Sequence, residues 1–171
     1  FLLGHWEGDN AMLSGQDGMT GVPSPEVMDQ MRIWLQNRQK AVEDGRASLP
    51  EIQGAEVYHY AEITSISPVL DAGLPRMITH VLPELTVDLV SYSAYNGTNL
   101  TDELPDRLWT HLDYILEHAS FTGAWKRGKP VFVGEYGLPL GIEPRRAPSN
   151  LISLKSAASW VVTLKSRSSA G

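Results

Sequence analysis

Two short apolar runs, each leading through a glycine to an acid, constrain the fold of this chain more than its other features. Residues 1–3 are Phe-Leu-Leu and lead to Glu7, and residues 131–133 are Val-Phe-Val and lead to Glu135. Apolar runs of this length are typical of strands buried on both faces of a parallel sheet. An acid that follows such a strand lies at the carboxyl edge of the sheet, where (β/α) barrels form their active sites. The sequence therefore predicts that both acids lie at a common edge.

Predicted strands and helices alternate along the chain. The predicted strands cover residues 1–5, 55–63 and 85–92, and a fourth follows Lys129-Pro130 and ends at Glu135. A glycine-rich loop is expected after the first strand, and short helical turns are expected around residues 67–75. This order predicts an α/β fold with parallel strands.

Two longer helices are predicted between these strands. Ser24 and Pro25 suit the N-cap and the first helical position, so the first helix is expected from there to about residue 43, with Gly45 as its C-cap. The second helix is predicted from residue 101 to about residue 122, because leucine and isoleucine recur on one face at helical spacing.

Four strands joined by three crossovers amount to half of a (β/α)8 barrel. Right-handed crossovers place the carboxyl ends of parallel strands at one edge, which Glu7 and Glu135 would share. The chain has 171 residues, whereas a complete barrel takes roughly 200 to 250. We therefore expect a partial TIM barrel over residues 1–140. Residue 1 enters a strand without an initiator methionine, so we expect a fragment of a longer protein.

The composition changes after residue 140. Residues 141–171 contain one acid, Glu143, against five Lys and Arg, together with seven serines. One interpretation is a non-native ending, produced by a frame shift or a cloning junction. The other is a natural basic helix followed by a disordered serine-rich end.

Charge and composition limit the partners of the chain. The formal net charge is −6, and no stretch combines Lys and Arg with aromatic residues as a nucleic-acid surface would. No apolar run approaches the roughly 20 residues of a membrane span. The absence of cysteine excludes disulfides and thiolate metal sites but assigns no compartment. Neither nucleic acid nor a membrane is expected as a partner.

A pair of carboxyl groups at one edge favours glycoside hydrolysis. That reaction uses one carboxyl group as general acid and the other as nucleophile or base. The alternative is that Glu7 and Glu135 each cap the helix that follows their strand, because carboxylates are stabilised near helix N-termini.

The segment around Glu135 resembles part of a known enzyme group. Residues 129–137 read Lys-Pro-Val-Phe-Val-Gly-Glu-Tyr-Gly, which is similar to the seventh strand of clan A glycoside hydrolases, the retaining (β/α)8 group of endoglucanases, mannanases and related β-glycanases. The resemblance implies that Glu135 is the nucleophile. It also implies an acid/base glutamate three strand-helix units earlier, which is the relative place of Glu7. The family usually has asparagine before this glutamate, whereas this chain has Trp6.

The same resemblance implies further site residues. A tyrosine at the end of the family's sixth strand commonly hydrogen-bonds the nucleophile, and Tyr92 or Tyr95 is expected to do so here. Trp6 is expected to stack on a sugar ring. The other residues expected to bind substrate are Asp9, Tyr58, Tyr60, Glu62 and Tyr136. Asp9 is also the competing candidate for the acid.

The resemblance implies a retaining glycosidase that acts on a β-linked plant polysaccharide, such as β-1,4-glucan or xylan, without a cofactor. Retention predicts that the two carboxyl groups stand about 5–5.5 Å apart. The localisation stays open, although the family favours secretion. Because the resemblance covers only the second half of a barrel, pairing of two half barrels into a homo-oligomer would complete the cleft and cover the exposed sheet edges.

Two other functions stay open at this point. In a metal-dependent hydrolase, His5, Glu7 and Asp9 would converge with His59 or Asp88, since catalytic zinc takes three protein ligands. For His59 the alternative is a buried, hydrogen-bonded histidine. The last function is a non-catalytic carbohydrate-binding or structural fragment of a glycosidase, which the aromatic residues at the strand ends would suit.

Overall fold

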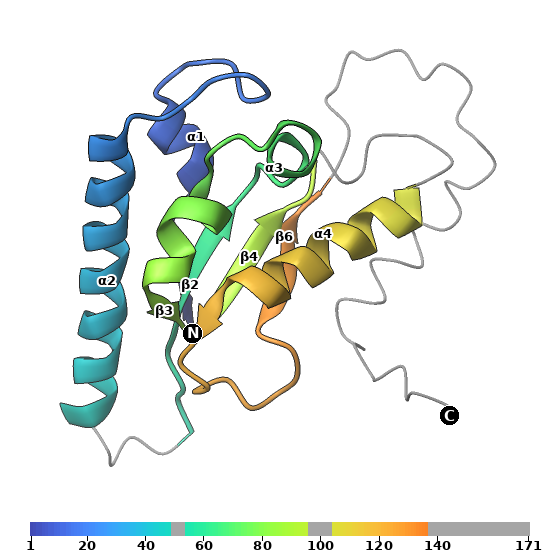
Figure 1. Cartoon of the computed structure of the whole chain (residues 1–171). Helices are drawn as coiled ribbons and strands as arrows, with labels where there is room; N and C mark the ends of the chain where they lie inside the picture. The colour runs from blue at the N-terminus through green and yellow to red at the C-terminus, as the bar shows by residue number, and fades with distance from the viewer. Residues whose placement is uncertain (49–53, 96–103, 137–171) are drawn as a thin grey trace.

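The computed structural model describes residues 1–48, 54–95 and 104–136, and the segment 141–171 lies outside these ranges. Four parallel strands form the main sheet in the order β1-β2-β4-β6 (Figure 1). They are β1 Leu2–Leu3, β2 Tyr58–Ile63, β4 Leu89–Ser93 and β6 Val131–Glu135. A smaller parallel sheet pairs β3 Thr86–Val87 with β5 Ser120–Phe121. The prediction of an α/β fold with parallel strands is confirmed.

Helical segments connect successive strands of the main sheet. They are α1 Gly8–Leu13, α2 Pro25–Ser48, α3 Ser67–Ala72, the π-helical turn η1 Met77–Val81, the 3-10 turn η2 Leu82–Glu84, and α4 Leu104–His118. Ser24 caps α2 as predicted, because its Oγ accepts a hydrogen bond from the backbone N–H of Val27 (3.4 Å). Within the described ranges, no helix has the length and apolar character needed to cross a membrane.

The hydrophobic core lies between the helices and one face of the main sheet. Its strand residues include Ala61, Ile63, Val90, Tyr92 and Val131, and its residues from helical segments include Leu35, Met77, Ile78, Val81 and Ile115. The predicted apolar face of α4 is confirmed, since Leu108, Leu112 and Leu116 pack against this core. Side chains alternate along a strand, so the residues between these core positions point to the opposite face of the sheet.

Asp88 interrupts the predicted third strand. It is fully buried between β3 and β4. Its carboxylate accepts hydrogen bonds from Arg46 (2.7 and 3.2 Å), Gln39 (3.0 Å), Thr122 (2.6 Å) and the backbone N–H of His59 (3.0 Å). Burial acts to raise the pKa of Asp88, but these hydrogen bonds outweigh it and the pKa is lowered. Strand pairing changes at this residue, because β3 pairs with β5 whereas β4 pairs with β2 and β6.

Three predictions about helices are wrong. The helix predicted to reach about residue 122 ends at His118, because Ser120 and Phe121 pair with β3 as strand β5. α2 does not end at Gly45 but continues to Ser48, because Arg46 in its last turn donates hydrogen bonds to Asp88 and to the carbonyl of Val57 (3.2 Å). The sequence also predicts no helix between the first strand and α2, yet α1 forms there. Its last two residues, Met12 and Leu13, are buried. Their burial stabilises a helix that is too short to be stable by itself.

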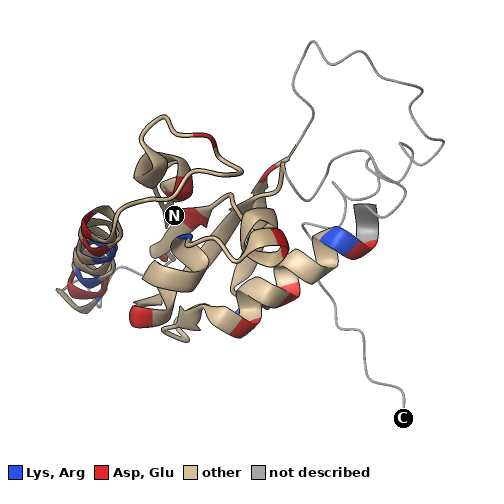
Figure 2. Cartoon of the chain, turned by 45° about the horizontal axis from the view of Figure 1, so that its top comes forward, with Lys and Arg blue, Asp and Glu red and all other residues tan. Residues whose placement is uncertain are grey.

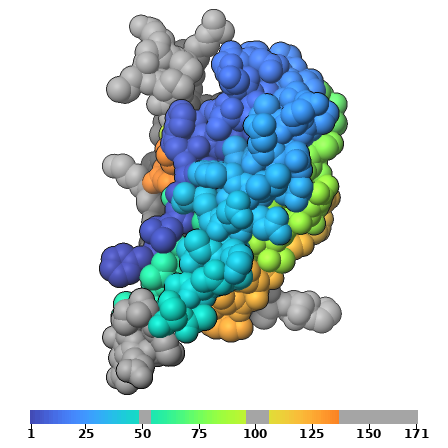
Figure 3. Space-filling model, turned by 90° about the vertical axis from the view of Figure 1, so that its left-hand side faces the viewer, coloured from blue at the N-terminus to red at the C-terminus, as the bar shows by residue number. Residues whose placement is uncertain are grey.

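β1 differs from the buried strand that the sequence predicts. It pairs with β2 and lies at the edge of the main sheet. The exposed fractions of Leu2 and Leu3 are 47% and 48%. Since these two side chains point to opposite faces, both faces of β1 are half open. Phe1 is also exposed, and the first residues project from the surface beside α2 (Figure 3).

We expect Asp88→Ala to lower the free energy of unfolding by about 3–5 kcal/mol, because the substitution leaves a paired cation and buried N–H donors without their acceptor. The urea midpoint of unfolding measures this loss. Asp71→Ala is the matched control, since Asp71 pairs with Arg107 (3.0 Å) at the surface, and it should cost less than about 1 kcal/mol. Equal losses in the two variants would contradict the central role of Asp88.

Candidate active site

The carboxyl ends of the four main strands carry most of the predicted site residues. Glu7 follows β1, Glu62 is the penultimate residue of β2, Tyr95 follows β4, and Glu135 ends β6. Because the strands are parallel, these ends lie at one edge of the sheet, where Figure 2 shows acidic positions in red. The carboxylates of Glu135 and Glu62 both act on the pKa of Glu7. The expected gathering of acids at one edge is therefore present.

A β-bulge determines the direction in which Glu135 points. Tyr92 pairs with Val133, but the next residue of β4, Ser93, pairs with Glu135, so Gly134 is an extra residue in β6. Val133 packs against the core. Without the bulge, alternation would send Glu135 to the core face as well. With the bulge, Glu135 lies beside Ser93 on the opposite face.

The glycines that precede the two acids make room for side chains of neighbouring strands. A Cβ at Gly134 would lie 2.1 Å from Oγ of Ser91 in β4. A Cβ at Gly4 would lie 1.9 Å from the ring of Tyr60 in β2. Neither glycine has a positive φ, so each is required for space and not for its backbone conformation.

Tyr95 makes the hydrogen bond that the family resemblance implies for the nucleophile. Its hydroxyl donates to Oε2 of Glu135 (3.0 Å). This bond raises the pKa of Tyr95, so the phenol stays protonated and continues to donate. Tyr92, the alternative residue, is fully buried on the core face, where its hydroxyl bonds with Nδ1 of His111 (2.6 Å). A substrate-binding role for Tyr92 is therefore not supported.

Glu7 has an uncommon backbone conformation. Its φ of 33° and ψ of 72° lie in the left-handed region, which costs a non-glycine residue about 1–3 kcal/mol and is often found at active sites. Glu7 occupies the N-cap position of α1, but its side chain makes no capping hydrogen bond. Instead its carboxylate accepts a hydrogen bond from Nδ2 of Asn10. These contacts argue against the helix-capping alternative for this acid.

The surroundings of Glu7 favour its protonated form. Only 7% of the residue is exposed. Burial raises the pKa of Glu7, the hydrogen bond from Asn10 opposes the rise, and repulsion from Glu135 and Glu62 adds to it. A carboxyl group with a raised pKa can hold its proton at the working pH and donate it in a reaction.

Glu62 is a third carboxylate on this face of the sheet. It is 5% exposed, and its Oε1 accepts a hydrogen bond from Oγ of Ser93 (2.7 Å). Its backbone N–H donates to Nε2 of His5 (3.1 Å), which links β2 to the segment that precedes Glu7. The structure thus places Glu62 at the same edge of the sheet as Glu7 and Glu135.

Asp9 and Tyr58 do not lie at the open edge. Asp9 is 1% exposed, and backbone N–H groups occupy both of its carboxylate oxygens. Tyr58 is the first residue of β2, at the opposite end of the strand, where its ring meets Trp125 edge-on at 5.1 Å. Substrate-binding roles for these two residues are not supported, because one is buried and the other lies a strand length away.

Three aromatic residues accompany the acids. Tyr60 shares the face of Glu62, and its ring packs edge-on against Phe132 at 5.6 Å. Trp6 and Tyr136 are 70% and 47% exposed, and each is adjacent in sequence to a predicted catalytic acid. Exposed aromatic rings beside polar groups are typical of binding surfaces.

The described residues do not support the metal-dependent alternative. Among them, no group of three His, Asp or Glu side chains could hold a metal ion. His59 is buried, and its Nδ1 bonds with Oε1 of Gln39 (3.1 Å), as expected for a buried, hydrogen-bonded histidine. Asp88 is occupied by its own hydrogen bonds at the other end of the sheet.

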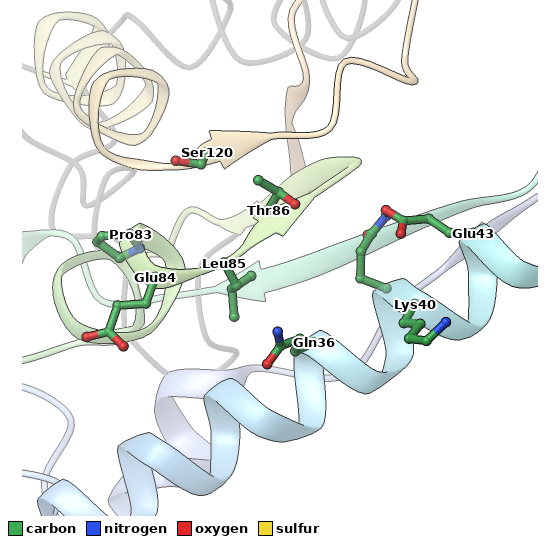
Figure 4. Close-up of a pocket in the computed structure, with 9 residues that line it drawn as sticks. Gln36, Lys40, Glu43, Pro83, Glu84, Leu85, Thr86 and Ser120 are labelled. Carbon is green, nitrogen blue, oxygen red and sulfur yellow. The ribbon is translucent and has the colours of Figure 1, made fainter.

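A groove of about 530 Å³ lies away from these acids, between α2 and the segment that contains η2 and β3 (Figure 4). Its lining consists of Gln36, Gln39, Lys40, Glu43, Pro83, Glu84, Leu85, Thr86 and Ser120. None of these residues belongs to the carboxyl edge of the main sheet. The groove mixes both signs of charge with apolar side chains, and we assign no function to it.

Comparisons of this chain with protein-family models, with curated proteins and with solved structures found no match.

The sequence did not reveal the polar residues that support the acids. Ser93 donates a hydrogen bond to the carboxylate of Glu62, and Asn10 donates one to that of Glu7. Period-two alternation in β4 could have indicated Ser93, because it places serines opposite the apolar positions. Asn10 had no such signal, since its role depends on the unpredicted helix α1.

Acid is expected to destabilise the fold between about pH 6.5 and pH 4 through buried histidines. Burial lowers the pKa values of His5, His59 and His111 to about 4, whereas unfolded histidine has a value of about 6.5. Within this window the unfolded chain binds protons that the folded chain does not. The free energy of unfolding therefore falls as the pH falls, and urea midpoints across the window measure the slope.

His59→Gln should flatten this slope, because it removes one buried histidine. His80→Gln is the matched control, since it makes the same substitution at an exposed histidine, and its slope is the reference for that of His59→Gln. The raised pKa values of Glu7 and Asp9 act on the slope in the opposite direction, so the comparison between the wild type and His59→Gln decides: equal slopes in the two would show that His59 does not stay neutral.

Proposed function

We propose that this chain is half of a (β/α)8 barrel of the retaining glycoside hydrolase type, and that it cleaves β-linked polysaccharide by double displacement. The observation that carries the proposal is a pair of glutamates at one edge of a parallel sheet in different surroundings. Glu7 is buried and has a raised pKa, whereas Glu135 accepts a hydrogen bond from Tyr95. These surroundings suit an acid and a nucleophile.

The strand order supports a barrel over an open, doubly wound sheet. The main strands follow one another in chain order, β1-β2-β4-β6. Doubly wound sheets reverse their order at a switch point and carry helices on both faces. Among the strands that the structure describes, the order does not reverse, and residues from α2, η1 and α4 join a core on one face. Four parallel strands with one helical layer are the arrangement that half of an eight-stranded barrel would have, and this supports the proposal.

The proposed reaction has two steps. In the first, Glu7 donates its proton to the glycosidic oxygen while Glu135 attacks the anomeric carbon, so that the leaving sugar departs and a glycosyl-enzyme forms. In the second, Glu7 takes a proton from water, whose oxygen displaces Glu135 and releases the sugar with its original configuration. No cofactor takes part in either step.

The proposed substrate is β-1,4-glucan or xylan. The family resemblance provides this substrate class, and the exposed rings of Trp6 and Tyr136 beside the two acids are consistent with stacking on sugar rings. Glu62 and Tyr60 line the same face and offer polar groups to hydroxyl substituents.

Substitution of the two acids tests the mechanism. Glu135→Ala should abolish hydrolysis of aryl β-glycosides, because no nucleophile remains. Glu7→Ala should reduce kcat/KM by about 10²–10⁴ for substrates with poor leaving groups, and far less for dinitrophenyl glycosides that need no proton. Added azide should restore turnover in Glu7→Ala, because azide attacks the glycosyl-enzyme without needing a general base. The product should be the β-glycosyl azide, because two displacements restore the original configuration.

Glu84→Ala provides the control, since Glu84 lies in η2 with an exposed side chain and should keep full activity. A 2-fluoroglycoside should also leave a covalent sugar on the peptide that carries Glu135. Activity that survives in Glu135→Ala, or a label on another residue, would refute the assignment of the nucleophile.

A non-catalytic carbohydrate-binding role is the second candidate, and the exposed Trp6 and Tyr136 favour it. Binding to insoluble cellulose or xylan that is lost in Trp6→Ala, without release of reducing sugar from any substrate, would support this role over catalysis.

We also propose that two copies of this chain pair through the edges of their main sheets. β1 and β6 are the outer strands, and β1 is apolar and half open on both faces. If β1 of one copy pairs in parallel with β6 of the other, a two-fold axis yields eight strands and closes the sheet.

Light scattering should therefore give twice the mass of the 171-residue chain. Leu3→Lys should shift the protein to monomer, because it places a charge in the strand pair. Val22→Lys, at an exposed position outside the main sheet, should leave the dimer intact. A monomeric wild-type chain would refute the pairing.

A further inference from the structure

Asp9 is a buried carboxylate two residues after Glu7, in the first turn of α1. Its Oδ1 accepts a hydrogen bond from the N–H of Met77 (2.8 Å), and its Oδ2 accepts from the N–H groups of Thr64 (3.0 Å) and Ser65 (3.3 Å). One carboxylate therefore fastens the start of α1 to two other segments: the loop after β2 and the start of η1.

The backbone between Glu7 and Asp9 has little room to move. A Cβ at Gly8 would lie 2.0 Å from Sδ of Met77 and 2.8 Å from Cε1 of His5. The chain therefore rests directly on Met77, whose N–H donates to Asp9. A helix of six residues is too short to hold its own start in place. The left-handed conformation of Glu7 is thus imposed by these tertiary contacts.

A second buried charge, the guanidinium of Arg76, fixes the loop that follows α1. Arg76 precedes Met77 and is fully buried. Its guanidinium donates to the carbonyls of Gly18 and Gly21 (3.0 Å each), in the loop after α1, and to that of Pro75 (2.7 Å). The start of α1 and the loop that follows it are therefore both tied to the start of η1.

We infer that Asp9 is the positioning residue of Glu7: it fastens the turn that carries this glutamate and so determines where its carboxyl group lies. The charge of Asp9 also raises the pKa of Glu7, although burial and the charges of Glu135 and Glu62 raise it more. Burial raises the pKa of Asp9 itself, and its N–H donors and Arg76 oppose the rise. The catalytic consequence rests on the proposed role of Glu7 as the acid, whereas the positional claim does not.

Asp9→Asn tests the inference. An amide has one acceptor oxygen, and its NH₂ group would face an N–H donor, so at least one of the three hydrogen bonds is lost. The pKa of Glu7, followed by carbon-13 NMR of its carboxyl carbon and assigned with Glu7→Gln, should fall, because both the fastening of its turn and the charge of Asp9 are lost. In the active protein, the basic limb of the pH profile of kcat/KM should move to lower pH by the same amount. The substitution should also lower kcat by a larger factor than it changes KM.

Two controls separate positioning from general loss of stability. Asp88→Asn weakens an equally buried carboxylate at the opposite end of the sheet, and it should lower stability without changing the pKa of Glu7. Asp17→Asn makes the same substitution in an exposed turn after α1, and it should change neither. If Asp9→Asn is partly unfolded, added sucrose restores the compact state for the measurement.

The outcomes distinguish this inference from the proposed function. An unchanged pKa of Glu7 in Asp9→Asn, or an equal change in Asp88→Asn, overturns the positioning role whether or not the protein hydrolyses sugars. A lowered pKa in Asp9→Asn alone, in a protein without any glycosidase activity, supports positioning and refutes the proposed function.

Discussion

The carboxylate of Asp88 receives hydrogen bonds from α2, from β2 and from the segment after β5, and the arrangement of the main sheet depends on this junction. A buried carboxylate without such donors would be strongly destabilising. The backbone N–H of His59 sets β2 against the start of β4. Since a strand is a rigid spacer of about 3.3 Å per residue, this contact also fixes how the far ends of the two strands meet. Glu62 and Ser93 form their hydrogen bond at those ends.

A second buried carboxylate, Asp9, performs the corresponding task at the opposite end. The two ends of the sheet differ in what they hold. The donors to Asp88 connect α2, β2 and the segment after β5. Asp9 instead stabilises a left-handed backbone conformation that is unfavourable for Glu7. Local strain of this kind persists only where surrounding contacts are numerous. The ion pairs of the described residues involve acids other than Glu7, Glu62 and Glu135, and the charges of Glu135 and Glu62 raise the pKa of Glu7.

Sequence reasoning predicts the elements whose signals are local. Apolar runs indicate the parallel strands, and Ser24 with Pro25 indicates the start of α2. It fails where a distant residue decides the outcome: Asp88 divides one predicted strand into two, and Arg46 extends α2 beyond Gly45. The site follows the same rule. The acids are recognisable because they follow apolar runs, but the choice of Tyr95 over Tyr92 depends on the face to which each points, and the burial of Asp9 depends on loops far along the chain.

The bulge at Gly134 separates the letters of the strand from its pairing. Before it, β6 alternates in one phase, and after it in the other, so a strand with the same letters in which Gly134 paired regularly would place its final carboxylate among the helices. A short motif that is matched letter by letter does not register such a change. For the geometry of the edge, however, the change is an inversion, and the irregular pairing of the strand is as much a part of the site as the acid itself.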